Sequence, residues 1–315
     1  MDKIPTVDFS HLSSATPPSQ SEWKEAAETV FNALSGIGFV YLTNHGVPDS
    51  VIENAFTESK DFFELPTETK MKSLKDISKS FNGYAAPGQE SLHKDVPFEL
   101  RESYDICGNL RYFPDTIRPK FGSAMNALEE ASKPLIKSLL RVLAISLKLE
   151  DTDFFVERTK ALDDLDIPSY TTIRSLYYPP TWNKNISPGT VRCGDHSDYG
   201  TLTLLFQDAI GGLEVKAVNG EWVSADPIPK TVLVNTGDLL EFWSGGVFPA
   251  THHRVLIPEQ ELRQKTARQS IVYFVHPDDK VVIQPLSQSS TNQQNYQPVT
   301  AKEHAETRLR ASYNY

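Results

Sequence analysis

Beyond about Ile167, the chain breaks into short runs of Val, Ile, Leu, Thr, Tyr and Phe that are separated by turn-forming residues. These runs are Ile173–Tyr178, Gly200–Phe206, Leu213–Val215, Trp222–Ala225, Val232–Asn235 and Ser270–Val275. β-Branched and aromatic residues favour strands, and many short strands at regular spacing are typical of a β-sandwich or barrel rather than of a parallel α/β sheet. This half of the chain therefore predicts an all-β core.

The preceding part of the chain shows helical periodicity instead. Apolar residues recur at helical spacing over Trp23–Leu34, Val51–Phe63 and Met125–Leu149, and Pro134 is expected to kink the third helix or to mark its start. The other expected elements are extended segments at Ile4–Phe9 and Phe39–Leu42, a loop at Phe81–Gly88, and a C-terminal helix from a capping box of Thr300 and Glu303 to Ser312. We therefore expect a helical N-terminal half that supports a β jelly-roll half.

Charge and composition restrict the partners. The net charge of −10 and the pI near 5.3 argue against a broad nucleic-acid-binding surface and against binding to an anionic membrane. The most apolar stretch is interrupted by Lys137, Arg141 and Lys148, so no membrane span is expected. There is no apolar segment of a signal peptide, and the two cysteines, Cys107 and Cys193, lie far apart. These features predict a cytoplasmic protein with reduced thiols. Because nothing in the sequence announces an interface, a monomer is expected.

His196 and Asp198 are the first candidates for chemistry. They lie two residues apart before an alternating apolar run, so on a strand their side chains would point to the same face. A histidine from a later strand would complete two imidazoles and one carboxylate on one side of a metal, which leaves coordination positions open and suits non-haem Fe(II) and oxygen chemistry. Of the adjacent His252 and His253, only one can face such a site. Cys193 is expected on the face opposite to His196, packed and unreactive.

The motifs around these residues resemble those of a known family. In chain order they are Ile4-Pro5-Thr6-Val7-Asp8, Asn44-His45-Gly46-Val47, Tyr178-Pro179-Pro180, His196-Ser197-Asp198, Asn235-Thr236-Gly237-Asp238, His253-Arg254-Val255 and Arg268-Gln269-Ser270. Over nearly the whole chain, the pattern resembles the Fe(II)/2-oxoglutarate-dependent dioxygenases of the isopenicillin N synthase-like superfamily, in particular fungal members similar to thymine 7-hydroxylase.

The resemblance implies a fold of the α+β, mainly β class, with a double-stranded β-helix (jelly-roll) core, a helical N-terminal region and flanking helices. The expected regions are an N-terminal dioxygenase region with helices and edge strands at 1–120, a long supporting helix and connection at 121–166, the Fe(II)/2-oxoglutarate jelly-roll at 167–280, and a C-terminal extension with a short helix at 281–315.

The resemblance also assigns roles to residues. Its His-Arg-Val motif selects His253, together with His196 and Asp198, as the Fe(II) ligands. Arg268 and Ser270 are two apart and share a strand face, where a guanidinium fork and a hydroxyl can bind a carboxylate. By resemblance, that carboxylate is the distal one of 2-oxoglutarate.

Tyr178 is implied to donate a further hydrogen bond to the same carboxylate. Many plant relatives have Asn two residues before this tyrosine, whereas this chain has Leu176. One co-substrate hydrogen bond is therefore missing, unless Arg174 or a water replaces it.

The implied reaction is oxidation, in the simplest case hydroxylation, of a C–H bond in a small organic molecule. Fe(II), 2-oxoglutarate and O2 supply the chemistry, and 2-oxoglutarate is decarboxylated to succinate. Fungal relatives suggest a secondary metabolite or a nucleobase-type substrate. Two alternatives stay open: an oxidase, cyclase or desaturase of the isopenicillin N synthase type that uses no 2-oxoglutarate, and a non-catalytic jelly-roll binding protein.

Four residues are candidates for substrate contacts. In thymine 7-hydroxylase-like members, the positions of Tyr199 and Phe274 carry the aromatic residues that flank a planar substrate. Core packing is an equally good interpretation of Phe274 and a poorer one of Tyr199. The family varies its pocket at Phe248, at the loops Phe81–Leu92 and Val96–Tyr104, and at the C-terminal helix. Arg101 could neutralise an acidic substrate, although a solvated arginine is the better interpretation.

Overall fold

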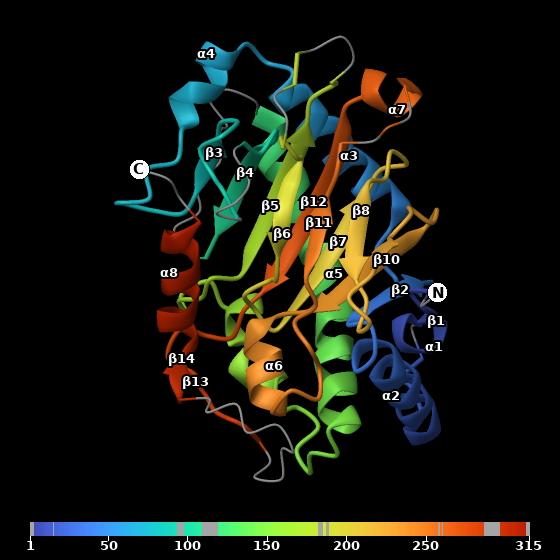
Figure 1. Cartoon of the computed structure of the whole chain (residues 1–315). Coiled ribbons are helices and arrows are strands. Elements are labelled where there is room, and N and C mark those ends of the chain that lie inside the picture. Colours follow the sequence, from blue (N-terminus) through green and yellow to red (C-terminus); the bar gives the residue numbers. More distant parts are fainter. Residues whose placement is uncertain are drawn as a thin grey trace.

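The computed structural model describes residues 3–14, 16–92, 98–108, 119–181, 185–186, 189–257, 259, 261–286 and 297–312. Most of its strands belong to two sheets (Figure 1). The eight-stranded sheet contains, in spatial order, β1 (Thr6–Asp8), β2 (Phe39–Thr43), β10 (Thr231–Thr236), β7 (Leu202–Gln207), β12 (Arg268–Val275), β5 (Thr172–Tyr178), β4 (Glu102–Cys107) and β3 (Gly83–Ala85). The four-stranded sheet contains β6 (Cys193–His196), β11 (His253–Val255), β8 (Leu213–Lys216) and β9 (Trp222–Ser224).

The large sheet joins segments from distant parts of the chain. Strands β1 and β2 form one edge and β4 and β3 the other, while β10, β7, β12 and β5 from the second half lie between them. Within this sheet only β1 and β2 pair in parallel; the other pairs of strands are antiparallel. The expected strands of the second half are confirmed. The prediction of a loop over Phe81–Gly88 is partly wrong, because Gly83–Ala85 forms a strand that pairs with β4.

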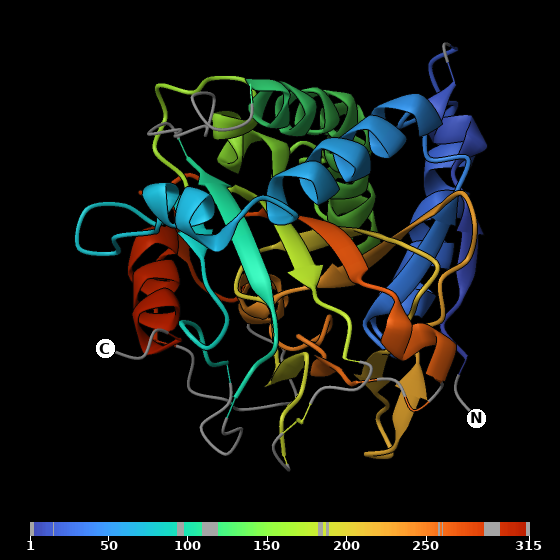
Figure 2. The ribbon, with the colours of Figure 1, turned by 90° about the horizontal axis from the view of Figure 1, so that it is seen from above.

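Three helices cover one face of the large sheet: α2 (Gln20–Leu34), α3 (Asp49–Phe63) and α5 (Pro119–Ser146). Figure 2 shows α3 and α5 together on this side of the sheet. Helix α5 begins at Pro119 and continues through Pro134, so Pro134 does not mark its start. The hydrogen bond that a proline removes is offset here by burial, since Leu135, Ile136 and Leu139 after it are all buried in the main hydrophobic cluster.

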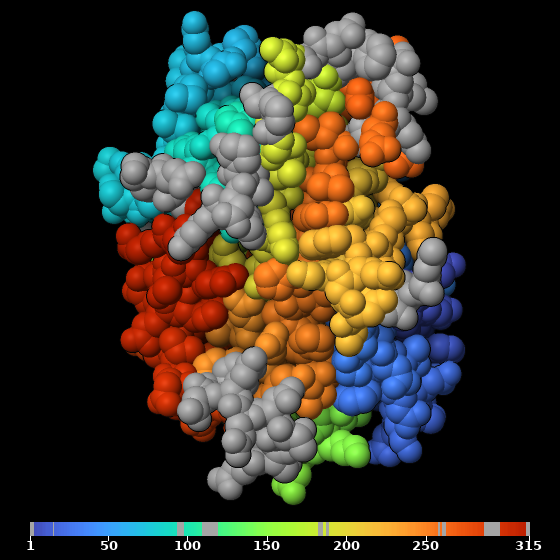
Figure 3. All heavy atoms as spheres, in the orientation of Figure 1, coloured from blue at the N-terminus to red at the C-terminus, as the bar shows by residue number. Residues whose placement is uncertain are grey.

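The remaining helices are short, apart from α8 at the C-terminal end. They are α1 (Ser10–Ser13), α4 (Thr67–Lys70), α6 (Asp238–Ser244), α7 (Glu261–Lys265), α8 (Ala301–Ala311) and the 3₁₀ turns Met71–Ser73, Val156–Arg158 and Lys160–Leu162. The expected capping box of α8 is confirmed, because the Thr300 hydroxyl accepts from Glu303 N and Glu303 accepts from Thr300 N. A two-stranded pair, β13 (Val282–Ile283) and β14 (Val299–Thr300), precedes this helix. In Figure 3, α8 is red and flanks the face that carries the small sheet.

Side-chain alternation divides each central strand between two environments. Ile271, Tyr273 and Val275 of β12 pack with the helices in the main hydrophobic cluster. On the opposite face, alternate residues of β12 and β5 line a cavity that residues of the small sheet also line. The cavity-lining set from these two strands comprises Arg268, Ser270, Val272, Phe274, Thr172, Arg174, Leu176 and Tyr178. The cavity therefore lies between the two sheets, on the side away from α2, α3 and α5.

None of the helices in the described ranges has both the length and the apolarity that crossing a membrane requires.

Packing of α5 against the sheet predicts the effect of a core truncation. Leu139 is fully buried, and its replacement by Ala should destabilise the protein by about 2–5 kcal/mol through lost burial and a residual cavity. Urea unfolding measures this change. The matched control is Leu165→Ala, at a leucine that is 45% exposed, which should have little effect. Equal effects of the two substitutions would contradict the packing described.

Candidate active site

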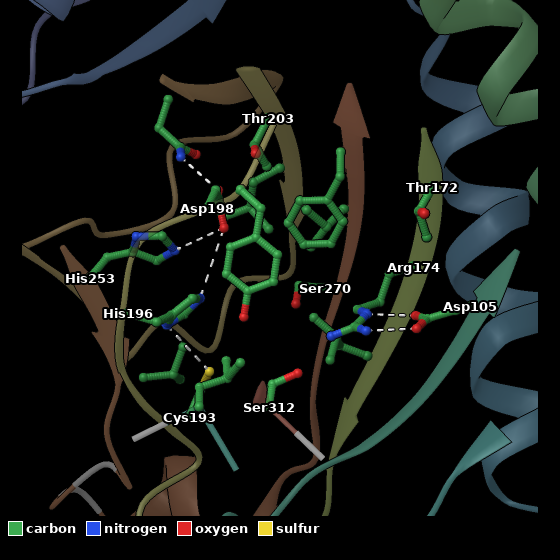
Figure 4. A pocket seen from close by; sticks show the side chains of 18 of the residues that line it. Asp105, Thr172, Arg174, Cys193, His196, Asp198, Thr203, His253, Ser270 and Ser312 are labelled. Carbon is green, nitrogen blue, oxygen red and sulfur yellow. Dashed lines mark hydrogen bonds and ion pairs between the residues drawn. The ribbon is translucent and has the colours of Figure 1, made fainter. Parts of the chain in front are cut away.

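Two histidines and one aspartate converge at one end of the cavity. His196 ends β6 and is the cross-strand partner of His253, which begins β11. The Nε2 atoms of His253 and His196 lie 3.7 and 3.9 Å from Asp198 Oδ1 (Figure 4). The candidate ligand atoms all lie within 4.8 Å of one another, so the group could hold a single metal ion. It is the sole group of this kind in the part of the chain that the structure describes.

Backbone carbonyls fix the orientation of both imidazoles. His196 Nδ1 lies 2.9 Å from Gly194 O, and His253 Nδ1 lies 3.1 Å from Thr251 O. A carbonyl oxygen can only accept, so each Nδ1 carries the proton and each Nε2 presents its lone pair toward Asp198. Such hydrogen bonds from the distal ring nitrogen are what orients histidines at metal sites.

The charge state of the group also suits a cation. Burial lowers the pKa of His196, and burial together with the nearby His196 lowers that of His253 to about 4, so both rings are neutral near pH 7. Burial opposes ionisation of Asp198, but the two histidines and the hydrogen bonds from Asn235 and Thr203 outweigh it and lower its pKa. Asn235 Nδ2 donates to Asp198 Oδ2 at 2.7 Å, which leaves Oδ1 directed at the imidazoles. Two neutral imidazoles and one carboxylate are a donor set that fits Fe(II).

The structure places the two adjacent histidines in different environments. His252 is exposed on the other face of the strand, where its Nδ1 lies 2.6 Å from Asp195 Oδ1. His253 is buried and lies in the cavity.

Strand alternation alone does not account for the positions around His196. Strand β6 ends at His196, so Asp198 reaches the group from the following turn and not from the same strand. Cys193 pairs with Val255 while His196 pairs with His253, so three steps along β6 match two along β11. This register shift reverses the alternation, and Cys193 lies on the cavity side with its Sγ 3.9 Å from His196 Nδ1. The expectation that Cys193 faces away is therefore wrong, although burial raises the pKa of its thiol to about 12 and keeps it protonated.

The expected carboxylate-binding residues lie together in the same cavity. Arg268 and Tyr178 are cross-strand partners, and the guanidinium carbon of Arg268 lies 4.8 Å from the centre of the Tyr178 ring. Arg268 is almost completely buried; its Nη1 donates to Ser270 Oγ at 3.3 Å and its Nη2 to Gln207 Oε1 at 3.4 Å. Its Nε has no hydrogen-bond partner among the described residues. A buried guanidinium with spare donors suits a small carboxylate.

Burial raises the pKa of Tyr178, so its hydroxyl stays protonated and can donate. Gln207 was not among the residues predicted from the sequence, although its place directly after the alternating run that ends at Phe206 was visible. Leu176 lies in the cavity wall, and Arg174 forms two hydrogen bonds with Asp105, through Nε at 2.5 Å and Nη2 at 2.6 Å. Arg174 is therefore already bound on the side of the cavity formed by β4.

Three of the four candidate substrate residues line the cavity: Tyr199, Phe274 and Arg101. Phe248 does not, because it is fully buried in the main hydrophobic cluster, with its ring 5.7 Å from that of Phe31 in an edge contact. The prediction that Phe248 contacts the substrate is therefore wrong, and this residue packs in the core. The prediction of a solvated arginine at position 101 is wrong. Arg101 is buried, with its Nη2 2.9 Å from Glu99 Oε2.

The C-terminal helix was expected where the family varies its pocket, and α8 does contribute to the cavity, although its individual contacts were not predicted. Leu309 and the adjoining Ser312 line it, and the guanidinium carbon of Arg308 lies 4.6 Å from the centre of the Tyr199 ring. Arg308 also donates to Ser197 Oγ at 3.1 Å and lies 3.3 Å from Asp238 Oδ2. No local pattern marks these contacts, because they join residues more than 60 positions apart. Of the loop Val96–Tyr104, residues 96–97 lie outside the described residues.

Comparisons with known proteins show the family to which this chain belongs. The family model of the 2OG-Fe(II) oxygenase superfamily matches residues 170–277, and that of the N-terminal region of non-haem dioxygenases in morphine synthesis matches residues 4–118. A 2-oxoglutarate-dependent dioxygenase, frbA, of a Dothideomycetidae species is 30% identical over 90% of this chain and 88% of its own length. A homoarginine-6-hydroxylase of Glycine max is 30% identical over 91% and 89%.

Solved structures agree. The full-length thymine 7-hydroxylase of Neurospora crassa in complex with alpha-KG superposes with a TM-score of 0.84 at 30% identity, covering 98% of this chain and 96% of that one. A second structure of that enzyme also contains thymine.

The two adjacent histidines allow a matched test of the metal group. We expect His253→Ala to weaken the binding of Mn(II) strongly, because one of three ligands is lost, whereas His252→Ala should bind as the unmodified protein does. Calorimetric titration of metal-free protein measures both. A similar loss in the two variants would contradict the assignment.

Asn235 tests the support of the carboxylate. Asn235→Ala removes the hydrogen bond to Asp198 Oδ2 and should lower metal affinity by about 10- to 100-fold, the usual effect of losing an outer hydrogen-bond partner. The same titration applies, with Asn219→Ala, at an exposed turn, as the control. An unchanged affinity of Asn235→Ala would show that Asp198 needs no such support.

Proposed function

This chain belongs to the 2OG-Fe(II) oxygenase superfamily, and we propose that His196, Asp198 and His253 hold its Fe(II) while Arg268, Ser270 and Tyr178 hold its co-substrate. The protein is a hydroxylating oxygenase that uses Fe(II), 2-oxoglutarate and O2. Bound together, these three supply an oxidation that converts 2-oxoglutarate to succinate and carbon dioxide and places one oxygen atom in a C–H bond of the substrate. We assign the two facing sheets to the double-stranded β-helix, or jelly-roll, architecture.

The observation that carries the proposal is the convergence of both groups on one cavity. The imidazoles and the carboxylate present one free ligand atom each, at the end formed by β6 and β11. Arg268, Ser270 and Tyr178 line the same cavity from β12 and β5. The chain's own contribution is therefore to orient the metal ligands, to hold one carboxylate at a buried guanidinium, and to keep bulk water away from the reacting atoms.

We propose a small substrate with a flat ring, held between Tyr199 and Phe274. Both residues line the cavity, and the neighbouring wall is mainly apolar, with Leu92, Leu205 and Val272. The Neurospora crassa enzyme, whose structure with thymine is similar to this one, supports a nucleobase-type ring. A fungal secondary metabolite is the other substrate class that the family resemblance implies. Arg101 provides no free charge for an acidic substrate, because it is paired with Glu99. The buried Cys107 and Cys193, which form no disulfide, are compatible with a reducing, cytoplasmic location.

Release of succinate tests the reaction. Purified enzyme with Fe(II), O2 and labelled 2-oxoglutarate is screened against panels of nucleobases and aromatic metabolites for stimulated succinate formation. Oxygen uptake without succinate would favour an oxidase that uses no 2-oxoglutarate. The buried guanidinium of Arg268, with its spare Nε, favours the 2-oxoglutarate-dependent reaction.

The role of Arg268 gives a quantitative prediction. Loss of a charged hydrogen-bond partner costs about 1.5–3 kcal/mol, so Arg268→Met should raise the KM for 2-oxoglutarate by about 10- to 100-fold while leaving the affinity for Fe(II) unchanged. Ser270→Ala, which removes a neutral partner, should cost about 0.5–1.5 kcal/mol. Steady-state kinetics with varied 2-oxoglutarate and varied iron separate the two effects. An equal rise for iron would sink the assignment.

A further inference from the structure

A second arginine, Arg192, lies buried close to the proposed co-substrate end of the cavity. It precedes β6, and its backbone N donates to Val255 O at 3.1 Å, which ties it to β11. Its side chain is fully buried, with 0% exposure. Within the described ranges, its Nε, Nη1 and Nη2 all lack a hydrogen-bond partner.

An unpaired buried charge is costly, so Arg192 needs an explanation. Burial, together with the positive charge of Arg268, lowers the pKa of Arg192 to about 10, and the group therefore still carries its charge at neutral pH. Charged side chains that are fully buried are ordinarily paired or bound to a ligand. Five unused N–H donors on a buried cation thus point to an anion that binds nearby.

The surroundings of Arg192 define where that anion belongs. Its guanidinium carbon lies 5.9 Å from the centre of the Tyr178 ring, and that of Arg268 lies 4.8 Å from the same ring. Asp208 is the carboxylate that interacts electrostatically with both arginines. Its Oδ2 accepts from Gln269 N at 2.5 Å and its Oδ1 from Ile210 N at 2.9 Å. Both carboxylate oxygens of Asp208 therefore accept hydrogen bonds from backbone N–H groups. The nitrogen atoms of Arg192 form no hydrogen bond with Asp208.

The charges at this end of the cavity do not balance. Among the described residues, Arg192 and Arg268 contribute two positive charges against the one carboxylate, that of Asp208, that interacts with both. Burial raises the pKa of Asp208, which weakens it further as a counter-charge. At least one positive charge is left uncompensated in a region of low dielectric constant, where its field on a bound carboxylate is strong.

We propose that Arg192 is a second cation for the distal carboxylate of 2-oxoglutarate, acting with Arg268, and that it makes the enzyme select a 2-oxo diacid over a 2-oxo monoacid. This inference rests on the proposed co-substrate site. Arg268 and Ser270 offer hydrogen bonds to the carboxylate. Arg192, beside Tyr178, offers its unused N–H donors and also the missing balance of charge. When the carboxylate binds, two positive and two negative charges face one another, and the cost of burying Arg192 is relieved.

Ligand truncation tests the inference directly. Mn(II)-loaded protein is titrated without oxygen with 2-oxoglutarate and with 2-oxopentanoate, which keeps the 2-oxo acid but lacks the distal carboxylate. Arg192→Met should weaken 2-oxoglutarate by about 10- to 100-fold, the scale of one charged partner, and leave 2-oxopentanoate unchanged. Arg192→Lys should retain most of the preference. The control Arg141→Met, at a half-exposed arginine on α5, should change neither affinity.

Thermal stability separates this role from a structural one. A residue needed for folding lowers the melting temperature when it is replaced, but removing an unpaired buried charge should raise it. We therefore expect metal-free, ligand-free Arg192→Met to melt at or above the unmodified protein, and to gain less stability from 2-oxoglutarate. If Arg192→Met does not fold, Arg192→Gln gives the same comparison.

The outcomes distinguish two failures. If Arg192→Met binds both acids normally, loses both equally, or melts lower without ligand, the role of Arg192 is overturned. If the unmodified protein shows no preference for the diacid, or Arg268→Met retains that preference, the proposed co-substrate site itself is wrong.

Discussion

The register of β12 between β5 and β7 is the constraint on which the site depends. Ile271, Tyr273 and Val275 are buried against the helices, so the residues between them must face the small sheet. A register shift of one residue would move Arg268 into the hydrophobic core and Ile271 into the cavity. It would therefore leave an unpaired charge buried in the core. The apolar core therefore positions the polar residues, and the carboxylate-binding end of the cavity follows from the packing of α3 and α5.

Buried charge is balanced along one side of the cavity and unbalanced at another. Three cations meet three carboxylates beside β4 and β5: Lys75, Arg101 and Arg174 with Glu90, Glu99 and Asp105. Ion pairs of this kind are tolerated in an interior only when each partner is compensated. This wall therefore presents no excess charge to a substrate, whereas the end near Arg192 and Arg268 carries excess positive charge. The difference separates a region for a neutral ring from a region for an anionic co-substrate.

Segments from both ends of the chain support the metal group. Glu99, in the N-terminal region, accepts from Gly194 N at 3.1 Å, and Gly194 O in turn holds His196 Nδ1 at 2.9 Å. From the C-terminal side, Arg308 of α8 contacts Ser197 and the ring of Tyr199, on either side of Asp198. The turn that carries Asp198 is thus held from two directions. This arrangement makes the orientation of the ligands depend on parts of the chain that contain none of them.

The sequence by itself determined the strands of the second half, the capping box of α8 and the motif residues that could hold a metal and a carboxylate, because hydrophobic period and local hydrogen bonds are encoded by neighbours along the chain. Only the tertiary structure decided the rest. The register shift in β6 places Cys193 on the cavity side, and Phe248 packs in the main hydrophobic cluster. Arg101 is buried as an ion pair with Glu99. Each of these outcomes depends on packing or ion pairing between residues that only the tertiary fold brings together. Such contacts decide which way a side chain points. Arg192 is the clearest case, since its missing partners become evident only when the whole surrounding interior is in place.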